Sequence, residues 1–303
     1  MEVSAPQPAS AGWLALRFKA VRAFSLPVSV LPVPVAAAAV LPVSRWNWPV
    51  LLASMAGAVL LHCAGNLLND YFDFRSGVYR KLDGDANRPG RLLVKGAMRP
   101  SEYLHEALAC LAAAGAITAY LVWACGWGIL LFGSAAAAAL YIYTGPPLAL
   151  KYHAMGEALI FITFGPLLMA GAAFAQTLRL EWAAVLASIP VGLATTAILV
   201  GNNVRDRDED SVAGIKTLSK VIGHRRLAML YIVLVCLAVT SLVAMAAWGA
   251  MPPALLAAPL LLALLVRPIS CVVRDERLSD IDARTARFET VLLLAMLAAL
   301  AAR

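Results

Sequence analysis

The chain leaves its second long apolar run through the segment GNLLNDYFDFR, residues 65–75. The run itself, roughly residues 48–69, is long enough to cross a bilayer as a helix. In a helix, the side chains of Asn66, Asp70 and Asp73 lie at i, i+4 and i+7, on one face. One amide oxygen and two carboxylates are ligands that Mg²⁺ prefers, usually together with phosphate oxygens of a substrate. The segment therefore predicts a membrane helix that ends in a cation-binding face.

A second segment, GNNVRDRDED at residues 201–210, ends another apolar run in the same way. Its Asn203, Asp206 and Asp210 lie at i, i+3 and i+7, which nearly repeats the first spacing. Acidic residues at one helix end are often simply solvated. Two matched acidic segments, each followed by basic residues, instead favour two walls of one cation site that face each other.

Composition assigns the chain to the integral membrane proteins. Of its 303 residues, 61% are hydrophobic and only 14% are charged, with a mean hydropathy of +0.77. Because soluble domains carry about 25% charged residues, we expect an all-α fold, a polytopic membrane helical bundle. About nine transmembrane helices, each of about 20 residues, are predicted at roughly residues 26–44, 48–69, 103–123, 127–145, 155–175, 182–203, 226–248, 251–272 and 286–302.

The basic residues follow the topology rule for membrane proteins. The net charge is +7 and the pI is about 9.3. With the N-terminus in the cytoplasm and nine spans, every Lys and Arg except Arg45, Arg179 and Arg303 falls in an inner segment. This predicts a protein of the inner (cytoplasmic) membrane with a cytoplasmic N-terminus and both acidic segments on the cytoplasmic side. Because topology explains the charge, we expect no nucleic-acid partner.

Basic residues accompany both acidic segments in the inner connections. Arg88, Arg91 and Lys95 follow the first segment, and Arg205 and Lys216 accompany the second. Carboxylates hold Mg²⁺, whereas Arg and Lys bind phosphate oxygens. Together they predict a diphosphate site at the membrane surface. A lipid diphosphate fits, because its head would stay at the polar rim while its tail lies among the helices. Metal ions and cationic side chains would stabilise a departing pyrophosphate.

Two motifs in these regions resemble those of the UbiA-type intramembrane aromatic prenyltransferases. The first is Asn66-x3-Asp70-x2-Asp73 with the later Asn87-Arg88-Pro89-x-Arg91 and Gly96, and the second is Asp206-x3-Asp210 with Gly214-x-Lys216-Thr217-Leu218. The resemblance runs from about residue 22 to about residue 300. It implies a single intramembrane prenyltransferase domain over residues 1–303, surrounded by membrane lipid. Such a domain uses Mg²⁺ to transfer a polyprenyl group from polyprenyl diphosphate to an aromatic acceptor.

The motifs and the resemblance together give the expected site. Its predicted members are the catalytic Asp70, Asp73, Asp206 and Asp210; the metal ligands Asn66, Asp70, Asp73, Asp206 and Asp210; the diphosphate-binding Arg88, Arg91, Lys95, Arg205 and Lys216; and the acceptor-binding Arg22, Tyr143, Lys151 and Asn203. Lys151 is equally well interpreted as an ordinary topology marker. His62, alone in an apolar run, is more typical of a hydrogen-bonded packing residue.

Three further stretches resemble one branch of that family, the 1,4-dihydroxy-2-naphthoate polyprenyltransferases of menaquinone synthesis. They are residues 202–206, Gly156-Glu157 with the later Phe164-Gly165-Pro166, and Thr285-Ala286-Arg287. This resemblance implies that the acceptor is prenylated at the carbon that bears the carboxylate, with loss of CO₂. The chain departs from the family pattern at Tyr79, where this branch usually carries an acid, and at Gly77, where other members of the family carry an Asp. A third carboxylate of the first motif is therefore missing unless Asp83 or Asp85 replaces it. The departure leaves the number of metal ions open.

Two alternatives to this function remain at the level of sequence. The first is another acceptor, such as 4-hydroxybenzoate, homogentisate or a glycerol phosphate lipid. The second is a cation-coupled transporter. Transporter sites lie near the bilayer midplane, with ionisable residues inside the spans. Here the acidic residues lie at helix ends and in inner connections, which favours the enzyme.

Overall fold

The computed structural model describes residues 12–78, 91–206, 217–276 and 278–302, and within these ranges it contains helices and no strand. The predicted all-α class is confirmed. In chain order the elements are α1 (Trp13–Ala20), η1 (Ala23–Ser25), α2 (Pro27–Val30), α3 (Pro32–Val40), η2 (Val43–Arg45), α4 (Trp48–Arg75), α5 (Arg91–Val94), α6 (Pro100–Cys125), α7 (Gly128–Thr144), η4 (Leu150–His153), α8 (Gly156–Ile162), η5 (Thr163–Leu167), α9 (Leu168–Thr177), α10 (Trp182–Arg205), α12 (Leu218–Ile222), α13 (His224–Ala247), η6 (Pro253–Leu265), α14 (Val266–Val273) and α15 (Ile281–Ala301).

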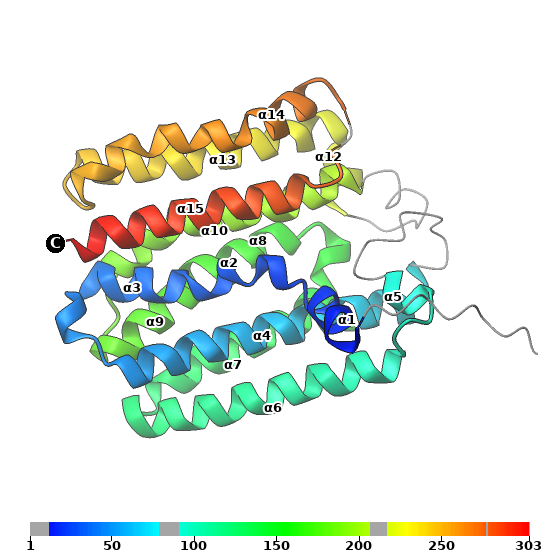
Figure 1. The fold of residues 1–303 in the computed structure, drawn as a ribbon, viewed down its shortest axis with the longest axis horizontal. Coiled ribbons are helices and arrows are strands. Elements are labelled where there is room, and N and C mark those ends of the chain that lie inside the picture. The colour runs from blue at the N-terminus through cyan, green and yellow to red at the C-terminus, as the bar shows by residue number, and fades with distance from the viewer. Residues whose placement is uncertain (1–11, 79–90, 207–216, 277, 303) are drawn as a thin grey trace, which may run out of the picture.

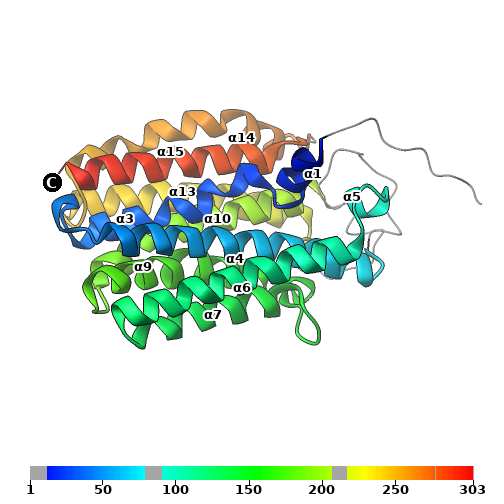
Figure 2. The same cartoon turned by 60° about the horizontal axis from the view of Figure 1, so that its bottom comes forward.

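The long helices lie side by side in one bundle (Figures 1 and 2). The short helices α1, α5 and α12 gather at one end of it, and the C-terminus lies at the other end (Figure 1). Helix α4 packs along α6, and α10 packs against α13 and α15. On α10, Ala184, Ala187, Ala194 and Ala197 are fully buried. Such small side chains let neighbouring membrane helices approach closely, so α10 lies at the centre of the main core cluster.

Seven helices of the described chain are long and apolar enough to cross a membrane. They occupy seven of the nine predicted spans. The fourth predicted span is the 17-residue helix α7, which is apolar but shorter. The ninth is α15, whose first half carries charged residues, among them Asp282 and Glu289. A helix therefore stands at each predicted place, but the count of nine spans is not confirmed.

Proline residues divide two of the predicted spans. In the first, α2 and α3 begin at Pro27 and Pro32, a position where the missing N–H costs no intrahelical hydrogen bond. In the fifth, the π-helix η5 contains Pro166 and separates α8 from α9. Single π-helical turns inside α-helices are frequent at functional sites. Phe164 of η5 lines the cavity described below.

Candidate active site

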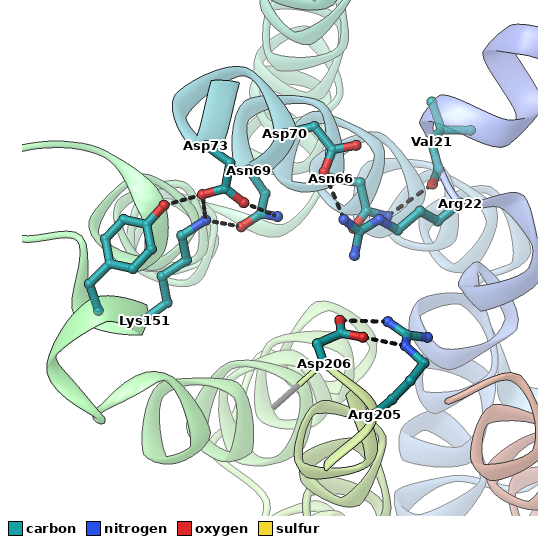
Figure 3. A network of polar contacts seen from close by, with 10 residues as sticks. Val21, Arg22, Asn66, Asn69, Asp70, Asp73, Lys151, Arg205 and Asp206 are labelled. Atoms are coloured by element: carbon teal, nitrogen blue, oxygen red, sulfur yellow. Dashed lines mark hydrogen bonds and ion pairs between the residues drawn. The ribbon is translucent and has the colours of Figure 1, made fainter. Parts of the chain in front are cut away.

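The candidate site lies where the ends of α4 and α10 face each other (Figure 3). The last turns of α4 carry Asn66, Asp70 and Asp73, and Asp206 follows directly after α10. Asp70 is fully buried and Asp73 is 9% exposed. A buried carboxylate is costly unless a cation or hydrogen-bond donors compensate its charge. Each of the three carboxylates has such a cation.

Arg22 neutralises Asp70 from the N-terminal part of the chain. Its Nη2 lies 2.8 Å from Asp70 Oδ1. Beside it, Asn66 Nδ2 donates to the carbonyl oxygen of Val21 at 2.9 Å. Arg22 has a left-handed backbone with φ of 55° and sits between α1 and η1. This conformation costs a non-glycine residue about 1–3 kcal/mol and recurs at functional sites. The bend is therefore held by contacts with α4.

Asp73 is held by the short helix η4 between α7 and α8. Lys151 Nζ lies 2.5 Å from Asp73 Oδ1 and 2.6 Å from Asn69 Oδ1. The hydroxyl of Tyr152 donates to the same Asp73 oxygen. Burial lowers the pKa of Lys151, and the Asp73 carboxylate opposes that shift. Burial and the nearby Asp73 raise the pKa of Tyr152, so its hydroxyl keeps the proton that it donates.

Replacing Lys151 with Met is expected to destabilise the fold, because Asp73 would stay buried without its cation. The two side chains are 11% and 13% exposed, and removing one member of a buried ion pair costs about 3–5 kcal/mol. Thermal unfolding in detergent should show a lower midpoint for Lys151→Met. Adding Asp73→Asn should recover part of the loss, because the two sites are coupled. Strictly additive losses in the double variant would contradict this.

Arg205 holds Asp206 on the opposite side of the site. Its Nε and Nη2 lie 2.6 Å and 2.9 Å from the two Asp206 carboxylate oxygens. Its Nη1 lies 2.5 Å from Asp282 Oδ2 on α15. The bidentate contact with Arg205 fixes the Asp206 carboxylate in one orientation. The guanidinium therefore joins the end of α10 to the start of α15.

Asn202 and Asn203, near the end of α10, have different surroundings. Asn203 Nδ2 donates to Glu157 Oε1 at 2.7 Å and does not line the cavity. Asn202 does line it, and its buried Oδ1 has no hydrogen-bond partner among the residues that the structure describes. A buried oxygen without a partner is uncommon. It is available to a ligand that brings a donor or a cation.

A cavity of about 310 Å³ extends from this polar end into the bundle. Polar side chains line its outer part: Arg22, Asn66, Asn69, Tyr143, Asn202 and Asp282. Mainly apolar side chains line the rest, among them Leu121, Ile129, Phe132, Leu167 and Leu168. A cavity with a polar rim and an apolar interior suits a molecule with a charged head and a hydrocarbon tail.

The ligands that the site offers are all oxygen atoms. Asp70, Asp73 and Asp206 supply carboxylates, and Asn66 and Asn202 supply amide oxygens. In the part of the chain that the structure describes, no three His, Cys, Asp or Glu side chains lie close enough to hold a metal by themselves. Mg²⁺ is commonly held by one or two carboxylates together with substrate phosphates. The available oxygens, with the open Asn202 Oδ1, fit that arrangement.

Several predicted site residues lie outside the described residues or do not line the cavity. Asp210, Arg88 and Lys216 lie outside the described residues. Arg91 begins α5, but its side chain is not described, and Lys95 is exposed after α5. Lys151 contacts Asp73 and does not itself line the cavity.

Sequence reasoning missed four residues of the site. Asn69 stands inside the first acidic segment, four residues before Asp73, so the helical phase of that segment could have found it. Asn202 stands next to the predicted Asn203 in the second segment, but the packing of α10 decides which of the two lines the cavity. Tyr152 follows the predicted Lys151 directly. Asp282 carries no local signal, because its partner Arg205 is distant in the sequence and only the packing of α15 on α10 brings them together.

Comparison with known proteins points to one family. The profile of the UbiA prenyltransferase family matches residues 29–300. A Bacillus subtilis protein named 1,4-dihydroxy-2-naphthoate octaprenyltransferase is 30% identical over 223 residues, which cover 73% of this chain and 70% of that protein. A Mycobacterium tuberculosis protein of the same name is 34% identical over 212 residues, which cover 68% of this chain and 70% of that protein.

A solved structure shows the same fold. It is a UbiA homolog from Archaeoglobus fulgidus bound to GPP and Mg²⁺, with a TM-score of 0.69 and 16% sequence identity. The match covers 95% of this chain and 100% of that chain. It extends over nearly all elements of the bundle.

Proposed function

The chain belongs to the UbiA prenyltransferase family, and we propose that it transfers a polyprenyl group from prenyl diphosphate to 1,4-dihydroxy-2-naphthoate in menaquinone biosynthesis. The observation that carries this proposal is the apolar cavity whose polar rim is built from both acidic segments. The choice of acceptor is supported by the names of the Bacillus and Mycobacterium relatives. In this proposal, residues 1–303 form one prenyltransferase domain in the inner (cytoplasmic) membrane, with the N-terminus in the cytoplasm.

The diphosphate of the donor is proposed to lie between the ends of α4 and α10. Asn66, Asp70, Asp73, Asp206 and Asp210 would hold Mg²⁺ there. When bound, Mg²⁺ neutralises the diphosphate and stabilises the pyrophosphate as it leaves. The A. fulgidus homolog, which was solved with GPP and Mg²⁺, supports this assignment. The prenyl tail would extend into the apolar part of the cavity.

Cationic side chains are proposed to complete the diphosphate site. Arg205 already lies beside the cavity-lining Asp282, and its contacts with Asp206 and Asp282 would be exchanged in part for phosphate oxygens. The same role is proposed for Arg88, Arg91, Lys95 and Lys216, which the sequence places in the two long connections at this end.

The acceptor is proposed to bind deeper than the diphosphate. Arg22 and Tyr143 line the cavity and can contact it directly, with Arg22 as a cation for its carboxylate. Lys151 and Asn203 would act from behind the cavity wall, because they contact Asp73 and Glu157. These four residues thus divide into two that touch the acceptor and two that position other groups.

The reaction balances without an added reagent. The bond between C1 of the prenyl group and the diphosphate oxygen breaks, and the pair of electrons leaves with pyrophosphate. The ring carbon that bears the carboxylate then bonds to C1, and a neighbouring hydroxyl loses its proton to give a ketone. Loss of CO₂ leaves its electron pair on the ring, which restores aromaticity as a naphtholate that takes the proton back.

The proposal is tested with the purified protein, prenyl diphosphate and Mg²⁺ against a panel of acceptors. We expect turnover with 1,4-dihydroxy-2-naphthoate. Turnover only with 4-hydroxybenzoate, homogentisate or a glycerol phosphate lipid would keep the prenyltransferase and reject this acceptor. The described acidic residues of the site lie at helix ends, which disfavours a transporter.

A further inference from the structure

A row of polar contacts joins the N-terminal part of the chain to α4 along one wall of the cavity. We call it the polar seam; its side chains are Arg22, Ser25 and Ser29 on the N-terminal part and His62, Asn66 and Asp70 on α4. All of them except Asp70 line the cavity. The proposed function uses Asn66, Asp70 and Arg22 and leaves the inner part of the seam unassigned.

His62 lies in that inner part. It stands one turn before Asn66 and two turns before Asp70 on α4, so it lies about 12 Å deeper in the bundle than Asp70 at 1.5 Å per residue. Its ring meets the Phe164 ring edge to face, with 5.4 Å between centroids. Both ring nitrogens contact serine hydroxyls, since Ser25 Oγ lies 3.2 Å from Nε2 and Ser29 Oγ is hydrogen-bonded to Nδ1.

The hydrogen bonds assign one tautomer to the neutral ring. Ser25 Oγ donates its only proton to the carbonyl oxygen of Arg22 at 2.8 Å. Towards His62 it can therefore only accept, so the ring carries its proton on Nε2. Nδ1 is then the acceptor, and the Ser29 hydroxyl donates to it. This leaves the lone pairs of Ser29 Oγ, a cavity-lining atom, open to a donor.

The proposed reaction needs a group that accepts a proton from the acceptor hydroxyl and later returns it. The acceptor hydroxyl must lose a proton when the ring carbon bonds to the prenyl group, and the ring oxygen regains a proton after CO₂ leaves. The carboxylates of Asp70, Asp73 and Asp206, beside the cavity, already face basic side chains. Among the described residues that line the cavity, His62 is the one neutral nitrogen base.

We propose that the Ser29–His62 pair takes this proton and gives it back. The acceptor hydroxyl donates to Ser29 Oγ while the Ser29 proton passes to His62 Nδ1, so the ring becomes an imidazolium and the acceptor a ketone. After CO₂ leaves, the proton returns by the same path to the naphtholate oxygen. The inference rests on the proposed prenyl transfer to a phenolic acceptor.

The test compares wild type with His62→Gln and Ser29→Ala, using whichever phenolic acceptor the wild-type protein prenylates. A wrong acceptor assignment therefore leaves the test intact. We expect kcat to fall about 100-fold or more, the usual contribution of a general base, with KM for prenyl diphosphate unchanged. A ring-fluorinated form of the same acceptor has a more acidic hydroxyl. With it, the loss should shrink to about tenfold or less, because an ionised hydroxyl needs no base.

The matched control is Ser241→Ala on α13. Its hydroxyl also bonds within a membrane helix, to the Ala238 carbonyl oxygen at 3.0 Å, but it lies away from the cavity. This variant should keep wild-type kcat with both acceptors. An equal loss with both acceptors in His62→Gln and Ser29→Ala would show a purely structural role and overturn the proposal. Unchanged kcat in both variants would overturn it as well. Thermal midpoints and prenyl diphosphate binding confirm that each variant is folded.

Discussion

Asp70→Asn should lower prenyl transfer by about 1,000-fold or more. The change keeps the shape of the side chain but removes a charge beside the cavity, where Asp70 is fully buried against the cavity-lining Arg22. In the proposed site this carboxylate is a ligand of the ion that stabilises the departing pyrophosphate. Such stabilisation is worth several kcal/mol, and each 1.36 kcal/mol is about tenfold in rate. Steady-state turnover in detergent with saturating prenyl diphosphate measures the loss.

Asp275→Asn is the matched control for this variant. Asp275 Oδ1 also faces a basic side chain, at 2.7 Å from His224 Nε2, but the Asp275 side chain is 62% exposed. Exposed pairs contribute little, so we expect turnover within about twofold of wild type. An Asp70→Asn protein that folds and keeps wild-type turnover would contradict the assignment of Asp70.

Removal of divalent ions with EDTA should stop turnover, and added Mg²⁺ should restore it. The physical reason is the set of carboxylate oxygens on Asp70, Asp73 and Asp206 (Figure 3), which the proposed function places around Mg²⁺ and the diphosphate of the donor. Binding can be followed without turnover, because a ligand that binds only the folded protein raises its thermal midpoint. At 100 times its Kd, a ligand adds about 2.7 kcal/mol of stability.

We therefore expect Mg²⁺ with prenyl diphosphate to raise the unfolding midpoint of wild type and to raise that of Asp70→Asn much less. Asp275→Asn should respond like wild type. Full turnover in EDTA would contradict the metal assignment. So would an equal shift of the midpoint in wild type and Asp70→Asn.

The helical phase of the acidic segments could be predicted from the sequence because it depends on local spacing. Asn66, Asp70 and Asp73 do share the C-terminal end of α4, and Asp206 faces them from the end of α10 (Figure 3). The ion-pair partners of Asp70 and Asp73 could not be predicted, because Arg22 and Lys151 come from distant parts of the chain. The left-handed Arg22 places its guanidinium at Asp70 only because α1 and η1 bend there.

The same distinction between local spacing and packing explains why the sequence favoured Asn203 although Asn202 lines the cavity. The spacing of the second segment favoured Asn203, but the structure turns Asn203 towards Glu157 on α8 and leaves Asn202 in the cavity wall. Periodicity gives the angle between two residues on a helix. It does not give the direction in which the helix faces, which here depends on how α10 packs against α8 and α15.

Gly77 gives a physical reason for one departure from the family pattern. Its φ is +79°, in the left-handed region that favours glycine. An Asp with this backbone would be strained, although a Cβ there would meet no neighbour within 4 Å. The turn after α4 therefore favours glycine at position 77, where the resemblance implies an Asp in other members of the family. Tyr79, the other departure, lies outside the described residues.

The most direct test of the proposed function follows the carboxylate of the acceptor. The purified protein is incubated with carboxyl-labelled 1,4-dihydroxy-2-naphthoate, prenyl diphosphate and Mg²⁺, and labelled CO₂ and prenylated product are counted together. The account predicts one labelled CO₂ for each prenylated product, with both absent in Asp70→Asn. A prenylated product that retains the label, or no product from this acceptor while another acceptor is prenylated, would contradict it.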